Sequence, residues 1–378
     1  MDGQVAARHS GPMQTSGAHQ VVPQVLDAEL VRAQYSPAAT YLNTASTGLL
    51  PARAVAAVRD AVAGMAEGRA NDSLFGDVEE ARAAFARIAG VPVSRVATGS
   101  SVATYTGLIA ASLPAGAEVL TAEGEFSSTV NPFHVRRDLK VRTVPLEALP
   151  DAVRPSTALV AVSAAQSADG RVADVAALRA VTREHGARLY VDVSQAAGWY
   201  PLAAHAAEAD FLASVAFKWL TCPRGVAFFV CPADREGFDA LTPAFAGWVA
   251  GENPWDSCYG PVAELAHSAR RFDESQGLVA YAGARHALAV IEELGPDAIR
   301  AHDLALAARF RAGLAGLGHE PVPAPDSPIV SVPGLGAKQP ELEKIGLQLS
   351  DRAGNLRASF HLYNTPADVD RLLDALSG

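Results

Sequence analysis

The chain contains little cysteine, no long apolar run and no excess of positive charge. Its three cysteines, Cys222, Cys231 and Cys258, are odd in number and have neither disulfide-framework nor metal-site spacing, so no metal is predicted. We expect packing residues, with a role for Cys222 at the edge of a site as the alternative. No apolar segment approaches the roughly 20 residues that span a bilayer. The net charge of −10 argues against nucleic acid or a membrane surface as the main partner.

The N-terminal segment 1–22 lacks the apolar core of a secretion signal. It is largely polar and rich in Gly, Ser and His, so we predict a flexible extension on a cytoplasmic protein. The whole chain of 378 residues, 49% of them hydrophobic and 19% charged, is long enough to bury a large core. We predict a large unit over residues 23–275, followed by long helices and a small C-terminal unit over residues 276–378.

Short apolar strands alternate with helical segments through most of the large unit. The predicted strands are residues 95–98, 118–121, 141–144, 158–163, 187–192, 210–214 and 226–231. Predicted helices include residues 101–111, 130–137 and 172–185. This alternation is typical of an α/β fold with a mostly parallel sheet between helices. Beyond it we predict helices at 278–294 and 296–317, then a small α/β unit with strands 329–332 and 356–361 and helices from 339 and over 366–376.

Lys218 carries the clearest chemical signal. It is a lone lysine in the apolar stretch 214–220, just after a predicted strand. Burial disfavours the ammonium form, so such an amine is a usable nucleophile near neutral pH. Asp192 ends another predicted strand, where open α/β sheets bind ligands, although it could instead cap the following turn. A Schiff-base lysine and an acid that keeps a pyridine nitrogen protonated are what pyridoxal 5'-phosphate (PLP) requires, so we predict a PLP enzyme.

Weaker signals come from five other side chains. Ser100 and Ser101 lie at a strand-to-helix junction, which suits an anion but equally a plain helix cap. Phe126 could stack on a cofactor ring or pack in the core. Gln195 follows Asp192 closely enough to reach a ring hydroxyl. Arg357, within an apolar strand, either binds a carboxylate or is solvated.

The order of these motifs resembles the class V aminotransferase family of fold-type I PLP enzymes. This family includes cysteine desulfurases, isopenicillin N epimerase-like proteins and kynureninase. The resemblance runs from residues 41–48 to residues 356–360, and its most specific segments are 191–198, 217–220 and 223–225. It implies a large domain with a seven-stranded sheet, a small C-terminal domain, and a homodimer that shares its active sites.

The resemblance also implies roles for the cofactor-facing residues. Lys218 would carry PLP and move the proton at Cα. Asp192 would pair with the pyridine nitrogen, and Gln195 would donate to the ring oxygen. Ser100 and Ser101 fall where the family binds phosphate.

Other positions follow by the same resemblance. Arg357 matches the arginine that receives the substrate carboxylate. A polar residue near the ring hydroxyl is either Gln166 or Ser167, and both remain open. Ser275 and Gln276 fall where a neighbouring subunit touches the phosphate.

The chain departs from the family pattern at several positions. Val215 and Phe217 stand where many relatives have a serine and a histidine near the phosphate, and Ser214 is a candidate to compensate. Phe126 replaces a stacking histidine, which removes an acid–base group above the ring. Thr44, on the expected substrate side, stands where the desulfurases have asparagine.

The reaction is expected to begin with bond cleavage at the substrate Cα. No cysteine follows Cys258, which argues against a persulfide-forming desulfurase. We predict β-elimination from an S-substituted cysteine, a C–S lyase reaction of secondary metabolism. The alternatives are aminotransfer, decarboxylating oxidative deamination of an S-conjugate, epimerisation, for which Phe126 is poor support, and a binding protein that has lost catalysis.

The segment 247–260 is the only other part of the sequence with a candidate role. Its aromatic residues Trp248, Trp255 and Tyr259 form either a lid or pocket wall, or part of a packed interface. The sequence does not specify the substrate side chain.

Overall fold

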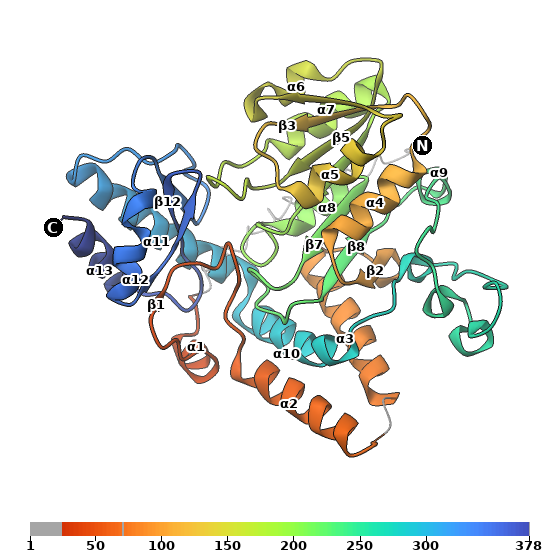
Figure 1. Ribbon diagram of the computed structural model, residues 1–378, viewed down its shortest axis with the longest axis horizontal. Coiled ribbons are helices and arrows are strands. Elements are labelled where there is room, and N and C mark those ends of the chain that lie inside the picture. Colours follow the sequence, from red (N-terminus) through yellow and green to blue (C-terminus); the bar gives the residue numbers. More distant parts are fainter. Residues whose placement is uncertain (1–24, 70–71, 378) are drawn as a thin grey trace, which may run out of the picture.

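A seven-stranded sheet forms the centre of the computed structural model, which describes residues 25–69 and 72–377 (Figure 1). The strand order is β2-β8-β7-β6-β5-β3-β4, and β8 alone runs antiparallel to its neighbours. The predicted α/β fold with a mostly parallel sheet is therefore confirmed. The predicted extension 1–22 lies outside the described residues. The strands are β2 (Val96–Gly99), β3 (Glu118–Ala122), β4 (Lys140–Val144), β5 (Thr157–Ser163), β6 (Arg188–Asp192), β7 (Phe211–Val215) and β8 (Ala227–Val230).

Helices follow most of the strands, and several of them begin at capping side chains. Ser101 accepts from the backbone N–H of Thr104 at the start of α4, and Asp174 does the same for α7. No helix in the described part of the chain is long and apolar enough to cross a membrane. The helices are α1 (Ala28–Gln34), α2 (Ala52–Ala66), α3 (Asp72–Ala89), α4 (Val102–Ser112), α5 (Ser127–Val135), α6 (Leu149–Ala152), α7 (Val175–His185), α8 (Leu202–Glu208), α9 (Arg235–Asp239), α10 (Leu278–Leu294), α11 (Pro296–Gly316), α12 (Gln339–Lys344) and α13 (Pro366–Ser377).

Both faces of the sheet are buried, because alternate residues of each strand point to opposite sides. Val160 and Val162 of β5 belong to the core that includes residues of α3, α7 and α10. Leu159 and Ala161 belong to a second core, shared with α4 and α5. This two-sided cover leaves the carboxyl ends of the parallel strands free to form a site.

A small C-terminal unit lies beside the sheet (Figure 1). Its antiparallel strands β11 (Ser350–Arg352), β12 (Asn355–Ser359) and β9 (Ile329–Val332) pack with residues of α11, α12 and α13. The early strand β1 (Thr40–Tyr41) joins this unit by pairing with β10 (Leu347–Gln348). The turn after β1 is thereby brought between the small unit and the sheet, and this turn forms part of the site described below.

A buried ion pair fixes the end of β2, where the predicted anion site begins. Arg82 of α3 and Asp273 lie 2.7 Å apart, with 3% and 2% of their side chains exposed. Arg82 also donates to the carbonyl of Val96, and Asp273 accepts from the N–H of Thr98. The pair therefore ties α3, β2 and the segment before α10 into one unit.

Replacing Arg82 with methionine should destabilise the protein strongly, because it leaves the Asp273 carboxylate buried without its cation. We expect the free energy of unfolding to fall by about 3–5 kcal/mol, measured by urea denaturation. The matched control is Arg87→Met, which breaks the exposed Arg87–Glu292 pair and should cost less than about 1 kcal/mol. Equal urea midpoints for the two variants would contradict this structural role.

Candidate active site

The loop that carries Lys218 follows β7 and is tightly fixed. Cys222 N–H donates to the Ala216 carbonyl at 3.0 Å, and Thr221 N–H donates to the Lys218 carbonyl at 3.1 Å. Thr221 has a φ of 52°, a left-handed conformation that is uncommon for a residue with a side chain. Gly48 packs against the same loop so closely that a Cβ on it would lie 2.0 Å from the Lys218 carbonyl oxygen, so only glycine fits.

Lys218 points into a cavity of about 380 Å³ and is only 6% exposed. Its Nζ lies 5.1 Å from the centre of the Phe126 ring. The described residues give this amine no salt bridge, although Asp192 lines the same cavity. The cavity is lined by Ala45, Ser46, Ser100, Ser101, Val102, Phe126, Ser128, Ser163, Ser167, Asp192, Ser194, Gln195, Val215, Phe217, Lys218, Arg224 and Arg352.

Asp192 and Gln195 are held in place by the protein at the carboxyl end of β6. One carboxylate oxygen of Asp192 accepts from Thr129 Oγ1 at 2.6 Å, and the other accepts from the N–H of Ser194 at 2.8 Å. The Gln195 amide donates to the Ala45 carbonyl and to Ser167 Oγ. Both side chains are buried at the wall of the cavity, where their orientation is set before any ligand binds.

At the N-terminus of α4, Ser100 and Ser101 both line the cavity but differ in their partners. The N–H and Oγ of Ser100 donate to the carboxylate of Glu274, at 2.6 and 3.0 Å. Ser101 Oγ accepts from the N–H of Thr104 and shares a 3.0 Å hydrogen bond with Thr104 Oγ1, in which either hydroxyl can donate; when Thr104 donates, the Ser101 proton is available to an anion. The first amides of α4 have no acceptor within the helix. An anion would therefore meet Ser101 and these amides, whereas Ser100 already has a carboxylate partner.

Arg357 lies directly behind the cavity wall. Its Nη2 donates to Ser46 Oγ at 2.8 Å, and its Nη1 donates to the carbonyl and hydroxyl of Ser167. The guanidinium is 1% exposed, and its Nε has no partner among the described residues. Burial and the nearby Arg352 lower the pKa of Arg357, so an anion reaching it through Ser46 and Ser167 would stabilise its charge.

The structure corrects three sequence-based assignments. Ser214 is fully buried and donates to the Val215 carbonyl, so it does not reach the cavity. Thr44 is buried against the Tyr363 hydroxyl rather than facing a substrate. Gln166 donates to the buried carboxylate of Glu125, so of the two open candidates only Ser167 faces the cavity.

Ser275 and Gln276 do not line the cavity of their own chain. The amide of Gln276 donates to Thr98 Oγ1 at 2.9 Å and to Asp273 at 3.2 Å. The prediction for both residues concerned a neighbouring subunit and stays a prediction. Cys222 is likewise absent from the cavity lining, and its buried thiol donates to backbone carbonyls, as expected of a packing residue.

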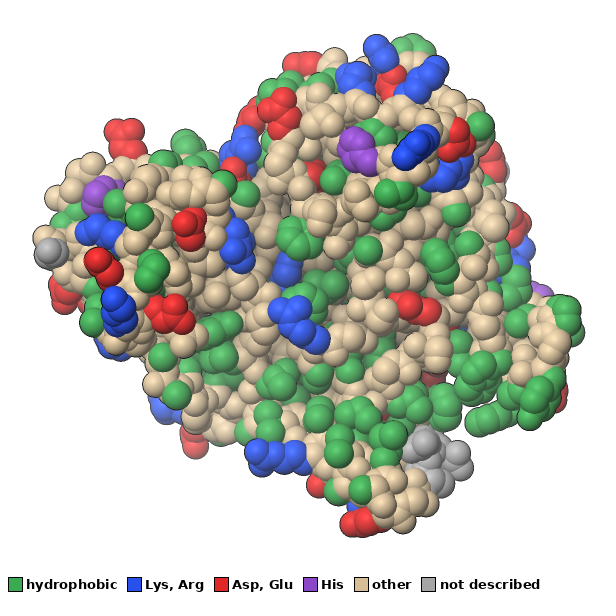
Figure 2. Space-filling view, in the orientation of Figure 1, with side chains coloured by type: hydrophobic (Ala, Val, Ile, Leu, Met, Phe, Trp, Pro, Cys, Tyr) green, Lys and Arg blue, Asp and Glu red, His purple; other side chains and the backbone are tan. Residues whose placement is uncertain are grey.

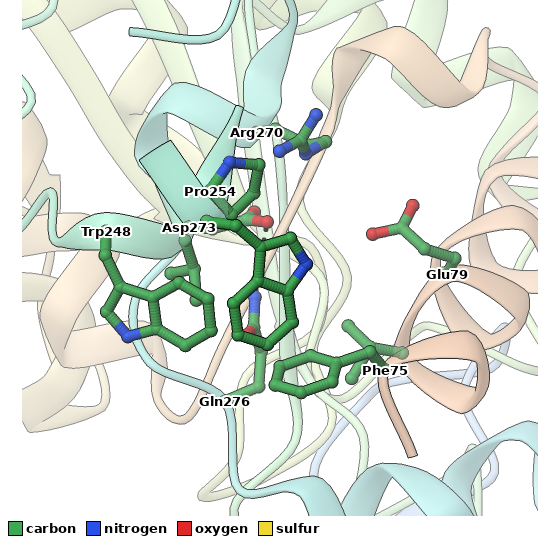
Figure 3. Close-up of a pocket in the computed structure, with 10 residues that line it drawn as sticks. Phe75, Glu79, Trp248, Pro254, Arg270, Asp273 and Gln276 are labelled. Atoms are coloured by element: carbon green, nitrogen blue, oxygen red, sulfur yellow. Dashed lines mark hydrogen bonds between the residues drawn. The ribbon is translucent and has the colours of Figure 1, made fainter. Parts of the chain in front are cut away.

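A larger cavity of about 570 Å³ lies elsewhere and has a different character (Figure 3). Its wall is aromatic, because Trp248 and Trp255 pack against Phe75 at ring distances of 5.9 Å. Its carboxylate Asp273 is already paired with Arg82. This cavity lacks an unpaired amine and is not the site of Lys218, although Gln276 borders it.

The sequence is similar to those of known proteins. The profile of the family described as Aminotransferase class-V matches residues 40–333. The chain belongs to the class V aminotransferase family. Isopenicillin N epimerase from Streptomyces clavuligerus is 30% identical over 386 residues, covering 90% of this chain and 94% of that protein.

Solved structures similar to this one share its fold. A cystine C–S lyase, C-DES, in complex with cysteine persulfide superposes with a TM-score of 0.81 at 22% identity, covering 90% of this chain and 97% of that one. A mutant of C-DES holds glycine covalently linked to its PLP cofactor, with a TM-score of 0.79 at 22% identity, covering 90% of this chain and 96% of that one. As a member of the class V aminotransferase family, this protein is a PLP-dependent enzyme.

The described residues fit PLP on their own geometry. A buried amine without a salt bridge, a fixed carboxylate and a helix N-terminus with free amides all border one cavity, with Phe126 beside the amine. Lys218 would bind the aldehyde carbon, Asp192 the pyridine nitrogen, and Ser101 with α4 the phosphate. Six polar residues that line this cavity were not predicted: Ser46, Ser128, Ser163, Ser194, Arg224 and Arg352.

Burial lowers the pKa of Lys218 from its ordinary value to about 8, with Arg357, Arg224 and Arg352 acting in the same direction and Asp192 opposing them. The neutral amine is the nucleophile, and its fraction rises with pH up to this value. In cofactor-free protein we expect the rate of PLP attachment to rise about tenfold per pH unit below pH 8 and to level off above it. Stopped-flow absorbance, with Nα-acetyllysine as the reference amine, measures this. A rate that keeps rising to pH 10 in parallel with the reference would contradict the lowered pKa.

Proposed function

We propose that this enzyme catalyses β-elimination from an S-substituted cysteine and releases a thiol. One observation carries the proposal. Among the described residues that line the cavity, Lys218 is the only basic side chain that exchanges a proton near neutral pH. The other cations are guanidinium groups, which stay protonated. A single base suits a reaction in which one proton leaves Cα and a group leaves Cβ from the same molecule.

Each step can be assigned to a residue of this chain. Bound PLP supplies an electron sink for the negative charge that develops at Cα. Lys218 Nζ would take the Cα proton, and the Cβ–S bond would break with its electron pair leaving on sulfur. The resulting thiolate would take up a proton from the Lys218 ammonium and leave as a thiol. Asp192 would keep the pyridine nitrogen of bound PLP protonated, and the buried Arg357 would attract the α-carboxylate from behind Ser46 and Ser167. The remaining 2-aminoacrylate takes up water and yields pyruvate and ammonia.

The cavity lacks the groups that two related reactions require. A persulfide-forming desulfurase needs a thiol at the substrate sulfur, but no cysteine lines the described cavity, and the exposed Cys258 lies outside it. An epimerase needs a second acid–base group on the opposite side of Cα, where Phe126 offers none. The likeness to isopenicillin N epimerase makes epimerisation the alternative to be tested first.

Product analysis tests the proposal. The PLP-loaded enzyme is incubated with a series of S-alkyl cysteines, without a 2-oxo acid, and its products are identified by mass spectrometry. Pyruvate, ammonia and the matching thiol in equal amounts are expected. Strict dependence on a 2-oxo acid indicates aminotransfer, a D-configured product indicates epimerisation, and loss of carbon dioxide with retention of the thioether indicates oxidative deamination. No product and no PLP binding would indicate a binding protein.

We further propose that the enzyme is a homodimer of secondary metabolism. Two large aromatic side chains of one segment are exposed: Trp255, which lines the cavity of Figure 3, is 68% exposed, and Tyr259 is 94% exposed. Such residues are enriched at protein interfaces. A mass of twice 39.3 kDa in light scattering supports the dimer, and a mass of one chain contradicts it.

A further inference from the structure

Two arginines, Arg224 and Arg352, line the cavity of Lys218 without a role in the steps above. Arg224 lies on the loop after Lys218, and Arg352 is the last residue of β11. Figure 2 shows Lys and Arg side chains gathered at the hollow between the small C-terminal unit and the sheet. Both arginines are exposed, so a solvent-facing role is the alternative to be tested.

Both arginines converge on the turn after β1. Arg224 Nη2 donates to Thr47 Oγ1 at 2.7 Å, and its guanidinium lies 4.1 Å from the centre of the Phe217 ring, a stacking that orients it. Arg352 Nη2 donates to Ser46 Oγ at 2.9 Å. Ser46 also accepts from Arg357 at 2.8 Å, so one hydroxyl joins two guanidinium groups.

This arrangement concentrates positive charge. The cavity lining contains three cations, Lys218, Arg224 and Arg352, and one carboxylate, Asp192, although the whole chain has a net charge of −10. Arg224 and Arg352 have no carboxylate partner among the described residues, unlike Arg82 or Arg154. Arg352 and Arg357 share the Ser46 hydroxyl, and Arg224 binds the neighbouring Thr47, so three like charges surround one turn, and an anion bound beside it would relieve their repulsion.

The binding roles assigned above for PLP and for the substrate α-carboxylate do not use the charges of Arg224 and Arg352. The phosphate of PLP belongs at Ser101 and the N-terminus of α4, and the pyridine nitrogen belongs at Asp192. The substrate α-carboxylate is assigned to Arg357. Arg224 and Arg352 lie beside Arg357 along the turn at residues 46–47, on the substrate side of the cavity.

We propose that Arg224 and Arg352 bind a second anionic group of the substrate, a carboxylate on the part attached to sulfur. The preferred substrates are then cysteine S-conjugates that carry a carboxylate beyond the sulfur. This inference rests on the proposed β-elimination for its substrate class, but the anion subsite can be tested by binding alone.

The test compares two substrates of nearly equal size. S-(2-carboxyethyl)cysteine carries the second carboxylate, and S-(2-carbamoylethyl)cysteine replaces it with a neutral amide. We expect the wild-type enzyme to favour the carboxylate by at least ~10-fold in kcat/KM, chiefly through KM. Arg224→Gln and Arg352→Gln should each remove most of this preference, so that kcat/KM falls much further for the carboxylate than for the amide; the readout is the ratio of the two values, because both arginines also lower the pKa of Lys218. Arg59→Gln, on the exposed surface of α2, is the matched control and should leave the preference intact.

Calorimetric Kd values for the same two compounds separate the subsite from the reaction. One outcome is that neither compound releases a thiol, but the carboxylate compound still binds more tightly than the amide and both variants abolish that difference. This outcome would support the anion subsite and contradict the proposed β-elimination. Equal Kd and kcat/KM values for the two compounds in the wild-type enzyme would overturn the subsite. Variants that weaken both compounds equally, or no binding of either compound, would overturn it as well.

Discussion

Replacing Lys218 with glutamine is expected to lower the rate of thiol release by at least ~10⁴-fold. Among the cavity-lining residues that the structure describes, Lys218 is the only basic side chain that can take up a proton near neutral pH. Loss of a positioned proton carrier alone lowers the rate by roughly 10²–10⁴-fold. The additional loss of its bond to PLP removes the nucleophilic contribution. Thiol release is measured with a chromogenic thiol reagent under saturating substrate and PLP.

A matched lysine provides the control for this variant. The chain has only four lysines, and Lys338 lies at the start of α12 in the small unit, outside the cavity lining. Lys338→Gln should retain full activity. If Lys218→Gln retained more than about 1% of the wild-type rate, another group would have to move the Cα proton, and the assignment of the base would be wrong.

Replacing Asp192 with asparagine is expected to lower kcat/KM by on the order of 10³-fold. Asparagine has the same shape; its Oδ1 can accept from Ser194 N–H and its Nδ2 can donate to Thr129 Oγ1, which reverses that bond but preserves the fold of the loop. It removes the negative charge that would keep the pyridine nitrogen protonated, and loss of one partner of a buried charge pair costs about 2–5 kcal/mol. Steady-state kinetics measure the loss, and circular dichroism checks that the fold is unchanged.

The exposed Asp151 on α6 offers a control for the loss of charge itself. Asp151→Asn changes the net charge by the same amount but lies outside the site, so kcat/KM should stay within about twofold of wild type. If Asp192→Asn behaved like this control, Asp192 would serve only as a turn residue and would not act on the cofactor.

The strands of the sheet were predicted closely from the sequence, whereas helices α2 and α3 were not predicted. Each predicted strand overlaps an observed one, because buried parallel strands are short apolar runs bounded by turns. Helices α2 and α3 were missed. Both are rich in alanine, but in α3 the large apolar residues Leu74, Val78 and Phe85 follow helical spacing and are buried, so the signal for this helix was present in the sequence.

The site was predicted in its chemistry but not in its detailed geometry. Lys218 and Asp192 stand out because a charged residue in an apolar strand end has few structural uses. Ser214 was assigned wrongly because successive side chains of a strand point to opposite faces, so Val215 faces the cavity and Ser214 does not. Ser194, which accepts from the Val215 N–H, occupies the cavity instead, and no local pattern distinguished it.

The arginines around the turn at residues 46–47 show the limit of sequence reasoning most clearly. Arg224 and Arg352 come from segments far apart in the chain, and a surface arginine is the usual expectation for both. Their convergence depends on β1 joining the small unit through β10, a pairing of two short strands without a distinctive pattern. Only the folded chain places them beside Lys218.

The central claim is that the side-chain nitrogen of Lys218 carries PLP. The direct measurement is reduction of the PLP-loaded enzyme with borohydride, followed by proteolysis and mass spectrometry of the peptides. We predict a stoichiometric pyridoxyl phosphate adduct on the peptide that contains Lys218, and none on those containing Lys140, Lys338 or Lys344. An adduct on another lysine, or an unmodified Lys218 in a fully loaded enzyme, would contradict the account.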